Sequence, residues 1–168
     1  ELIAQLVSVC HQWSITGTFN KFSAHLIVSG SALSPARNRL LKFESRLESN
    51  KKPLLKPEWV SGSFLYIDKK NFNKLGGWDE DYWMYYEDMD LCKRAKNIGM
   101  EIVLINSISC THHHGKSSRI NLKTTVKTKT HLTRSGIIFI DKHYTGLSQK
   151  ILKFLFVSSR VIEYLLFS

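Results

Sequence analysis

The sequence is poor in cysteine: it contains three, Cys10, Cys92 and Cys110, among 168 residues. An odd number without the spacing of metal ligands argues against a disulfide-rich secreted domain and against a cysteine zinc site. No stretch reads as a signal peptide with a basic start and a small-residue cleavage site. We therefore expect reduced, mostly buried thiols in a protein of the cytosol.

A long apolar run is also missing. The tail that follows Leu147 is interrupted by charged and hydroxyl residues, namely Lys153, Ser158, Ser159, Arg160 and Glu163. A membrane-spanning helix needs about 20 mostly apolar residues, so the tail does not read as one. It favours a helix at a membrane surface, with apolar bulk on one side and basic side chains that reach the headgroups. The competing interpretation is a helix docked on the rest of the chain or on a second subunit.

Acidic residues are scarce relative to basic ones. The chain has 14 Asp and Glu against 24 Lys and Arg, which gives a formal net charge of +10. The basic residues are scattered and no nucleic-acid-binding motif accompanies them, so we favour an anionic ligand or an anionic membrane surface over nucleic acid. At 43% hydrophobic residues, the chain can bury one core but hardly two domains.

The acids that are present gather in one segment, from Gly76 to Gly99, which reads GGWDEDYWMYYEDMDLCKRAKNIG. Apolar residues at helical spacing and the closing glycine predict a helix that begins near Glu87 or Asp88. Backbone N–H groups at such a start hold a carboxylate ionised and fixed in direction, as a general base requires. The simpler interpretation is a pair of N-capping acids plus an Asp90–Arg94 pair, which contributes a few tenths of a kcal/mol.

Shorter signals predict the other elements. We expect a helix or a buried strand at 2–7, strands at 25–30, 60–67, 101–105 and 108–111, helices at 35–46 and 69–75, a loop at 49–57, and one or two basic helices within 121–145. Gly62 would let a sugar ring approach the backbone closely or would mark an ordinary bulge. Trp78 could stack on a sugar or fill the core.

Three consecutive histidines follow the expected strand at 108–111. In an extended chain His112 and His114 would share one face and His113 would point away. Such a triplet is usually solvated or a fortuitous metal site. The segment from Lys116 to Arg119 could bracket a diphosphate or form a plain polar loop.

These blocks together resemble family 2 glycosyltransferases. The pattern G-G-F-D-E, two aromatics and E-D-x-D-L-x-x-R is similar to the segment at 76–94, the family's G-A-F strand is similar to 60–65, and its last strand and histidine are similar to 102–115. The resemblance covers residues 59–119 and is strongest to rhamnosyltransferase-like enzymes of bacterial surface polysaccharides, including lipopolysaccharide.

The resemblance implies an α/β fold, the C-terminal portion of a GT-A domain with a mixed sheet and flanking helices. Residues 1–119 would be the acceptor and base half, and 120–168 a basic, amphipathic helical extension. Complete family members are longer, since a nucleotide-binding half with an Asp-x-Asp metal pair precedes the acid motif. We therefore expect this chain to be the C-terminal part of an enzyme.

The implied reaction transfers a sugar from a nucleotide-sugar donor to a saccharide or lipid-linked acceptor with inversion, at the inner face of the cell membrane. Asp88 would be the general base, assisted by Glu87. Sugar and diphosphate contacts would come from Gly62, Trp78, Asp79, Tyr82, Asp90 and Arg119. His112 would bind a divalent metal, Mn²⁺ or Mg²⁺. Two other classes stay open: a non-catalytic, membrane-associated binding module, and a nucleic-acid-binding domain.

Overall fold

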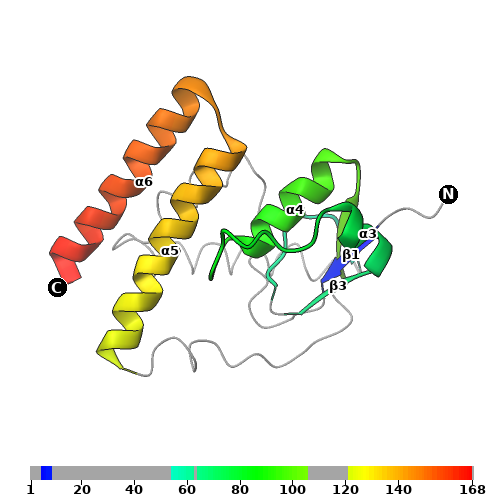
Figure 1. Ribbon diagram of the computed structural model, residues 1–168, viewed down its shortest axis with the longest axis horizontal. Coiled ribbons are helices and arrows are strands. Elements are labelled where there is room, and N and C mark those ends of the chain that lie inside the picture. Colours follow the sequence, from blue (N-terminus) through cyan, green and yellow to red (C-terminus); the bar gives the residue numbers. More distant parts are fainter. Residues whose placement is uncertain (1–4, 9–53, 63, 106–120, 168) are drawn as a thin grey trace. The chain divides into compact units, whose positions relative to one another are not determined.

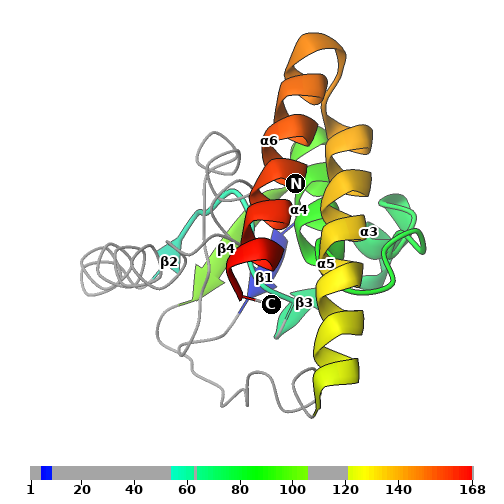
Figure 2. The ribbon, with the colours of Figure 1, turned by 90° about the vertical axis from the view of Figure 1, so that its left-hand side faces the viewer.

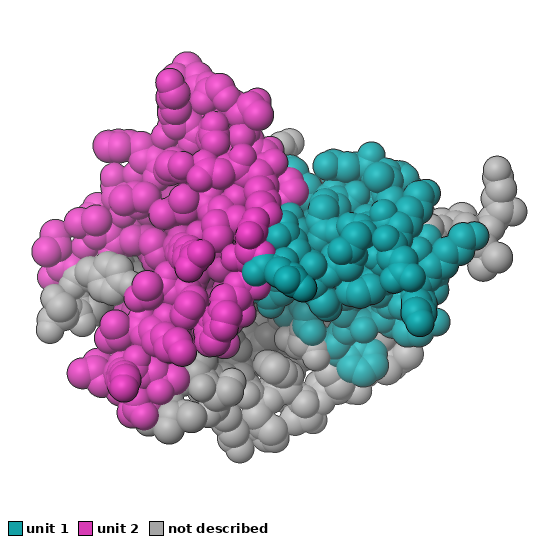
Figure 3. Space-filling view, in the orientation of Figure 1, with its two compact units in different colours: residues 1–18, 43–80, 87–114 teal, residues 19–42, 81–86, 115–168 magenta. Residues whose placement is uncertain are grey.

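The computed structural model describes residues 5–8, 54–62, 64–105 and 121–167 (Figure 1). Their elements follow in chain order: β1 (Gln5–Ser8), β2 (Leu54–Leu55), β3 (Leu65–Ile67), α3 (Lys69–Lys74), α4 (Glu87–Asn97), β4 (Glu101–Ile105), α5 (Leu122–His143) and α6 (Gly146–Phe167). They divide into two compact units (Figure 3). The first contains β1 to β4, α3 and α4, and the second contains the segment 81–86 with α5 and α6.

The first unit is built on a mixed sheet with the strand order β2-β4-β1-β3 (Figure 2). β1 is parallel to β4, with Leu6 opposite Ile102, and antiparallel to β3, with Leu6 opposite Ile67. β2 adds an antiparallel edge to β4. The described elements are thus those of an α/β protein.

Local signals set the ends of the two helices in this unit. The Asp68 side chain caps α3 by accepting a hydrogen bond from the Asn71 N–H at 2.9 Å. The chain then turns through Gly76 and Gly77, whose φ angles of 79° and 74° favour glycine. α4 begins at Glu87, as its acidic first turn predicts, and ends before Gly99.

The core of the first unit lies between α4 and β4. Leu91, Cys92 and Ala95 of α4 are fully buried, and Ile102 and Leu104 of the strand are almost completely buried. Burial raises the pKa of the Cys92 thiol to about 12, so this cysteine is a protonated core residue, as expected.

The second unit contains a helical hairpin in which α5 and α6 lie side by side (Figures 1 and 2). Phe139 and Ile140 of α5 and Phe156 of α6 are fully buried. A Cβ atom at Gly136 would collide with the Phe156 ring, so this glycine allows the ring to lie directly against α5. None of the described helices, α6 included, is apolar over enough length to cross a membrane.

Four sequence-based expectations need correction or refinement. The strand expected at 60–67 is formed only at Leu65–Ile67, because the Gly62 N–H donates to a side chain of α4 instead of to a neighbouring strand. The loop expected at 49–57 contains the short strand β2. The ambiguous run at 2–7 contains strand β1, and 121–145 holds one long helix. The elements expected at 25–30, 35–46 and 108–111 lie outside the described residues.

Candidate functional site

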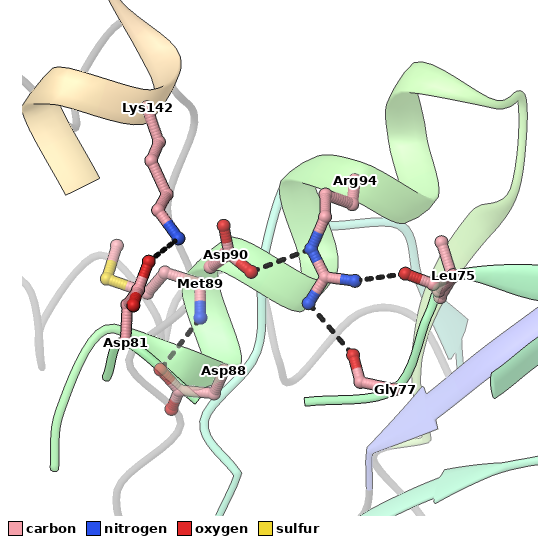
Figure 4. Close-up of polar contacts among 8 residues, drawn as sticks. All are labelled: Leu75, Gly77, Asp81, Asp88, Met89, Asp90, Arg94 and Lys142. Carbon is pink, nitrogen blue, oxygen red and sulfur yellow. Dashed lines mark hydrogen bonds and ion pairs between the residues drawn. The ribbon is translucent and has the colours of Figure 1, made fainter. Parts of the chain in front are cut away.

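Asp88 is held at the start of α4 by two backbone groups. Its Oδ2 atom accepts a hydrogen bond of 2.8 Å from the Gly62 N–H. Its Oδ1 atom accepts one of 2.8 Å from the Met89 N–H, which Figure 4 shows. A Cβ atom at Gly62 would lie 3.3 Å from the Asp88 Cβ. Gly62 therefore permits a close approach of its backbone to the carboxylate, which a larger residue would push away.

The surroundings make Asp88 and Glu87 stronger bases than free carboxylates. Burial raises the pKa of Asp88, and its hydrogen bonds to the N–H groups of Gly62 and Met89 offset only part of that rise. Burial also raises the pKa of Glu87, and the neighbouring charge of Asp88 adds to the effect. The helix start was expected to keep these acids ionised, but desolvation is the larger influence. A raised pKa suits a group that must accept a proton near neutral pH.

Arg94 connects α4 to the turn that precedes Trp78. Its Nε atom donates to Asp90 Oδ2 at 2.7 Å, and its two terminal nitrogens donate to the carbonyl oxygens of Leu75 and Gly77 (Figure 4). Asp90 is only 1% exposed and the Arg94 side chain 24%. This arrangement of four residues, joined by three hydrogen bonds, is more than the solvated i,i+4 pair that the sequence suggested, because it fixes a turn from another part of the chain.

A pocket of about 620 Å³ opens beside this turn. Its lining residues are Gly62, Phe64, Leu65, Tyr66, Ile67, Lys69, Phe72 and Trp78. Trp78 rests edge-on against Phe72, with ring centroids 5.9 Å apart, and stays 44% exposed. Of the two interpretations of Trp78, the structure favours an accessible ring over a core residue. Gly62 both lines this pocket and binds Asp88, so the carboxylate is anchored on a residue of the pocket wall, while Asp88 itself is not among the lining residues.

Four other residues are predicted for the site: Asp79, Tyr82, Arg119 and His112. Asp79 is half-buried, and Tyr82 is only 6% exposed in the second unit, where Lys142 Nζ lies 5.4 Å from the centre of its ring. Arg119 and His112 lie outside the described residues. Within the described part of the chain, no group of three or more His, Cys, Asp or Glu side chains is arranged to hold a metal ion.

Residues 42–117 match a protein family described as the N-terminal domain of galactosyltransferase. This stretch contains Asp88, Gly62 and the whole lining of the pocket. We call residues 42–117 the glycosyltransferase segment, because they are similar to this family. The match confirms the resemblance drawn from the acid motif, over a similar stretch of sequence.

Two kinds of curated relative share the glycosyltransferase segment. An N-acetylglucosaminyl-diphospho-decaprenol L-rhamnosyltransferase, known from two strains of Mycobacterium tuberculosis, is 37% identical over 75 residues, which are 45% of this chain and 24% of the relative. Rhamnosyltransferase WbbL of Escherichia coli K12 is 32% identical over 89 residues, 48% of this chain and 33% of the relative. The chain thus spans a third or less of these relatives. No solved structure matches it significantly.

Sequence reasoning missed several residues of the glycosyltransferase segment. Phe64 and Tyr66 line the pocket, and their i,i+2 spacing within the strand predicted at 60–67 could have placed both on one face. The Arg94 contacts to Leu75 and Gly77 had no comparable signal, because they join residues 17 and 19 positions apart through backbone carbonyls. The bond between Gly62 and Asp88 joins residues 26 positions apart.

Proposed function

We propose that this glycosyltransferase segment transfers a sugar from a nucleotide-sugar donor to a saccharide or lipid-linked acceptor, with Asp88 as the general base. The observation that carries the proposal is the anchoring of the Asp88 carboxylate, with a raised pKa, on the Gly62 backbone at the wall of an aromatic pocket. The glycosyltransferase relatives support the class of reaction.

The proposed chemistry is a single displacement. The acceptor hydroxyl oxygen attacks the anomeric carbon while its proton passes to a carboxylate oxygen of Asp88, and the bond from that carbon to the nucleotide diphosphate breaks with its electron pair. One displacement inverts the anomeric configuration. Each Asp88 oxygen has two lone pairs, so the bonds from Gly62 and Met89 leave acceptor capacity for the incoming hydroxyl.

The pocket suits a sugar ring. Phe64, 48% exposed, and Trp78 offer aromatic faces for the apolar faces of a saccharide, and Lys69 adds a donor at the margin. We propose that Trp78, with Asp79, contacts the sugar, while Asp90 acts through Arg94 by holding the turn on which Trp78 lies. The names of the relatives favour a rhamnosyl donor and, in the mycobacterial case, an acceptor linked to a lipid diphosphate.

A divalent ion and two further residues complete the proposal. We propose that His112 binds Mn²⁺ or Mg²⁺ and that Arg119 contacts the donor diphosphate; both follow from the family resemblance, and the roles given to the described residues do not depend on them. If His112 is a ligand, His112→Ala should raise the Mn²⁺ concentration needed for half-maximal turnover more than His113→Ala does. Equal effects of the two substitutions would mean that His112 is not a metal ligand.

We also propose that α6 attaches the protein to the inner face of the cell membrane. A groove of about 580 Å³ on this helix is lined by four apolar residues, by Ser158 and by two lysines, Lys150 and Lys153. Large exposed apolar side chains continue along the helix: Leu147, Ile151, Phe154, Leu155, Val157, Val161, Ile162 and Leu165. Apolar surface bordered by lysines suits an anionic lipid surface, where a lipid-linked acceptor would be found.

Sugar transfer in the full-length protein tests the proposed reaction. With a nucleotide-sugar donor and a lipid-linked or saccharide acceptor, Asp88→Asn should lower kcat by about 10²- to 10⁴-fold and leave donor binding nearly unchanged. Glu101→Gln is the matched control, because Glu101 is a half-exposed carboxylate paired with Lys56 and lies outside the site. Acceptor binding without transfer in the wild type would favour the binding-module alternative. Equal turnover in the two variants would mean that Asp88 is not the general base.

A further inference from the structure

Lys69 differs from the other residues around the pocket of about 620 Å³. Within the described lining it is the only charged residue, because the rest are glycine, aliphatic or aromatic. Lys69 is exposed, and in the described part of the chain its ammonium group forms neither an ion pair nor a hydrogen bond. A single ammonium group in an otherwise uncharged pocket suits a ligand that combines an apolar ring face with an anionic group.

The carboxylate next to Lys69 in the sequence is bound elsewhere. Asp68 caps α3: its Oδ1 atom accepts a hydrogen bond of 2.9 Å from the Asn71 N–H, and its Oδ2 atom accepts one from the Asn71 side-chain amide. The described lining of the pocket contains no carboxylate. An anionic ligand in the pocket would therefore meet the Lys69 ammonium group without a lining carboxylate to repel it.

Lys69 and the aromatic wall of the pocket belong to one rigid frame. Lys69 and Phe72 are three residues apart in α3 and so share a face of this helix. The Phe72 ring meets Trp78 edge-on with centroids 5.9 Å apart, and the Phe72 carbonyl accepts a hydrogen bond of 3.0 Å from the Gly77 N–H. Arg94 holds the same turn (Figure 4). One ligand can thus contact the indole ring and the ammonium group together without a rearrangement of the frame.

The position of the proposed base indicates which substrate enters this pocket. Asp88 takes the proton of the acceptor hydroxyl, and its carboxylate is bound to Gly62 of the pocket wall. In an inverting displacement the attacking oxygen and the leaving group lie on opposite sides of the anomeric carbon. The leaving diphosphate of the donor therefore lies on the side away from Asp88, and the pocket whose wall holds Asp88 lies on the side of the acceptor.

We propose that the pocket is the acceptor subsite and that Lys69 selects an acceptor sugar that carries a phosphate group. The sugar ring stacks on Trp78, and the phosphate binds the ammonium group of Lys69. Lysine acts as a point charge rather than as a planar fork, so it gains most from the anion with the larger charge, which favours a phosphate over a carboxylate. Lys69 is a specificity-determining residue here, and the inference rests on the proposed function of Asp88.

The first test compares two lysines of α3 in the full-length protein. Lys69→Met and Lys74→Met remove the same charge from exposed positions, but only Lys69 lines the pocket. The two acceptors are a sugar on an alkyl diphosphate and the alkyl glycoside of the same sugar. Lys69→Met should raise the KM for the diphosphate acceptor about five- to tenfold, with the KM for the glycoside, the donor KM and kcat changed less than about twofold. Lys74→Met should leave all of these values within about twofold.

Three outcomes of the kinetic comparison would overturn the proposal. Equal losses in Lys69→Met and Lys74→Met would mean that only the overall charge of α3 matters. An equal rise in KM for both acceptors would mean that Lys69 does not recognise the phosphate. A rise in the donor KM in place of the acceptor KM would assign Lys69 to the donor.

Equilibrium binding measured by calorimetry tests Lys69 without turnover. Glucose 1-phosphate should bind the wild type more tightly than methyl glucoside or glucuronate does, and Lys69→Met should remove this difference. Trp78→Ala should weaken glucose 1-phosphate and methyl glucoside alike, whereas an effect on neither would reduce the site to a simple anion site and overturn the proposal. Glucuronate that binds as tightly as glucose 1-phosphate would overturn the selection of phosphate. If Asp88→Asn keeps wild-type turnover, the proposed base fails, and that result is separate from these binding comparisons.

Discussion

Two ion pairs of similar length lie in very different surroundings in the two units. Arg94 and Asp90 approach to 2.7 Å with Asp90 almost completely buried, and the same guanidinium binds two backbone carbonyls. Lys153 and Asp141 approach to 2.6 Å, but both side chains are 41% exposed. A buried pair that also satisfies backbone groups fixes geometry, whereas an exposed pair contributes little. The first unit uses charge to hold a turn at the pocket, and the second carries charge at its surface beside exposed apolar side chains.

The largest expected effect would come from breaking the buried pair. Arg94→Met leaves Asp90 buried without its cation and leaves the Leu75 and Gly77 carbonyls without their donor, so unfolding free energy should fall by about 3–5 kcal/mol. Lys153→Met, the matched change at the exposed pair, should cost less than about 1 kcal/mol. Denaturant melts of both variants measure the difference. Similar losses in the two would mean that burial does not distinguish the pairs.

A smaller effect is expected at Gly62. Gly62→Ala places a Cβ about 3.3 Å from the Asp88 Cβ, so either the backbone or the carboxylate must shift. We expect a loss of about 1–3 kcal/mol in stability and a fall in kcat that exceeds any change in the donor KM. Thermal melts and steady-state kinetics on the same preparation check both parts. Wild-type kcat in Gly62→Ala would show that the contact with Asp88 is not needed for turnover.

The exposed face of α6 provides the third comparison. Phe154→Glu introduces a charge into the apolar face, and binding to vesicles that contain anionic lipid should fall several-fold in a sedimentation assay. Lys123→Glu, at an exposed position on the other helix of the hairpin, changes charge without touching this face and should reduce binding less. High salt should weaken wild-type binding only partly, because apolar burial persists. Unchanged sedimentation of Phe154→Glu, or a change in oligomeric state instead, would assign the face to a protein partner.

Local sequence signals predicted the parts of the fold that depend on neighbouring residues. The bounds of α4 and β4 follow from acidic first-turn residues, apolar spacing and Gly99, and the turn at Gly76 and Gly77 follows from the paired glycines. The sequence also singled out Asp88 and Glu87, since carboxylates at a helix start are visible in the pattern alone.

Contacts between distant segments could not be predicted in this way. The expected strand at 60–67 was wrong over its first half because Gly62 bonds a side chain of α4, and nothing near Gly62 in the sequence signals that partner. The contacts of His131 with Trp83 and of Ser135 with Met84 had no signal either, because a basic helix with hydroxyl residues reads as a solvated helix until those partners are placed against it. His112 and Arg119 lie outside the described residues, so their roles stay predictions.

The pH dependence of single-turnover sugar transfer tests the role of Asp88 most directly. A base must be unprotonated, so the rate should fall as the pH drops through the pKa of Asp88, and burial places that pKa above the range usual for an aspartate. We expect the acidic limb of the pH–rate profile to lie at higher pH than a solvated aspartate would give, and Asp88→Asn to show a low rate without that limb. A limb of unchanged position and height in Asp88→Asn would contradict the assignment of the base.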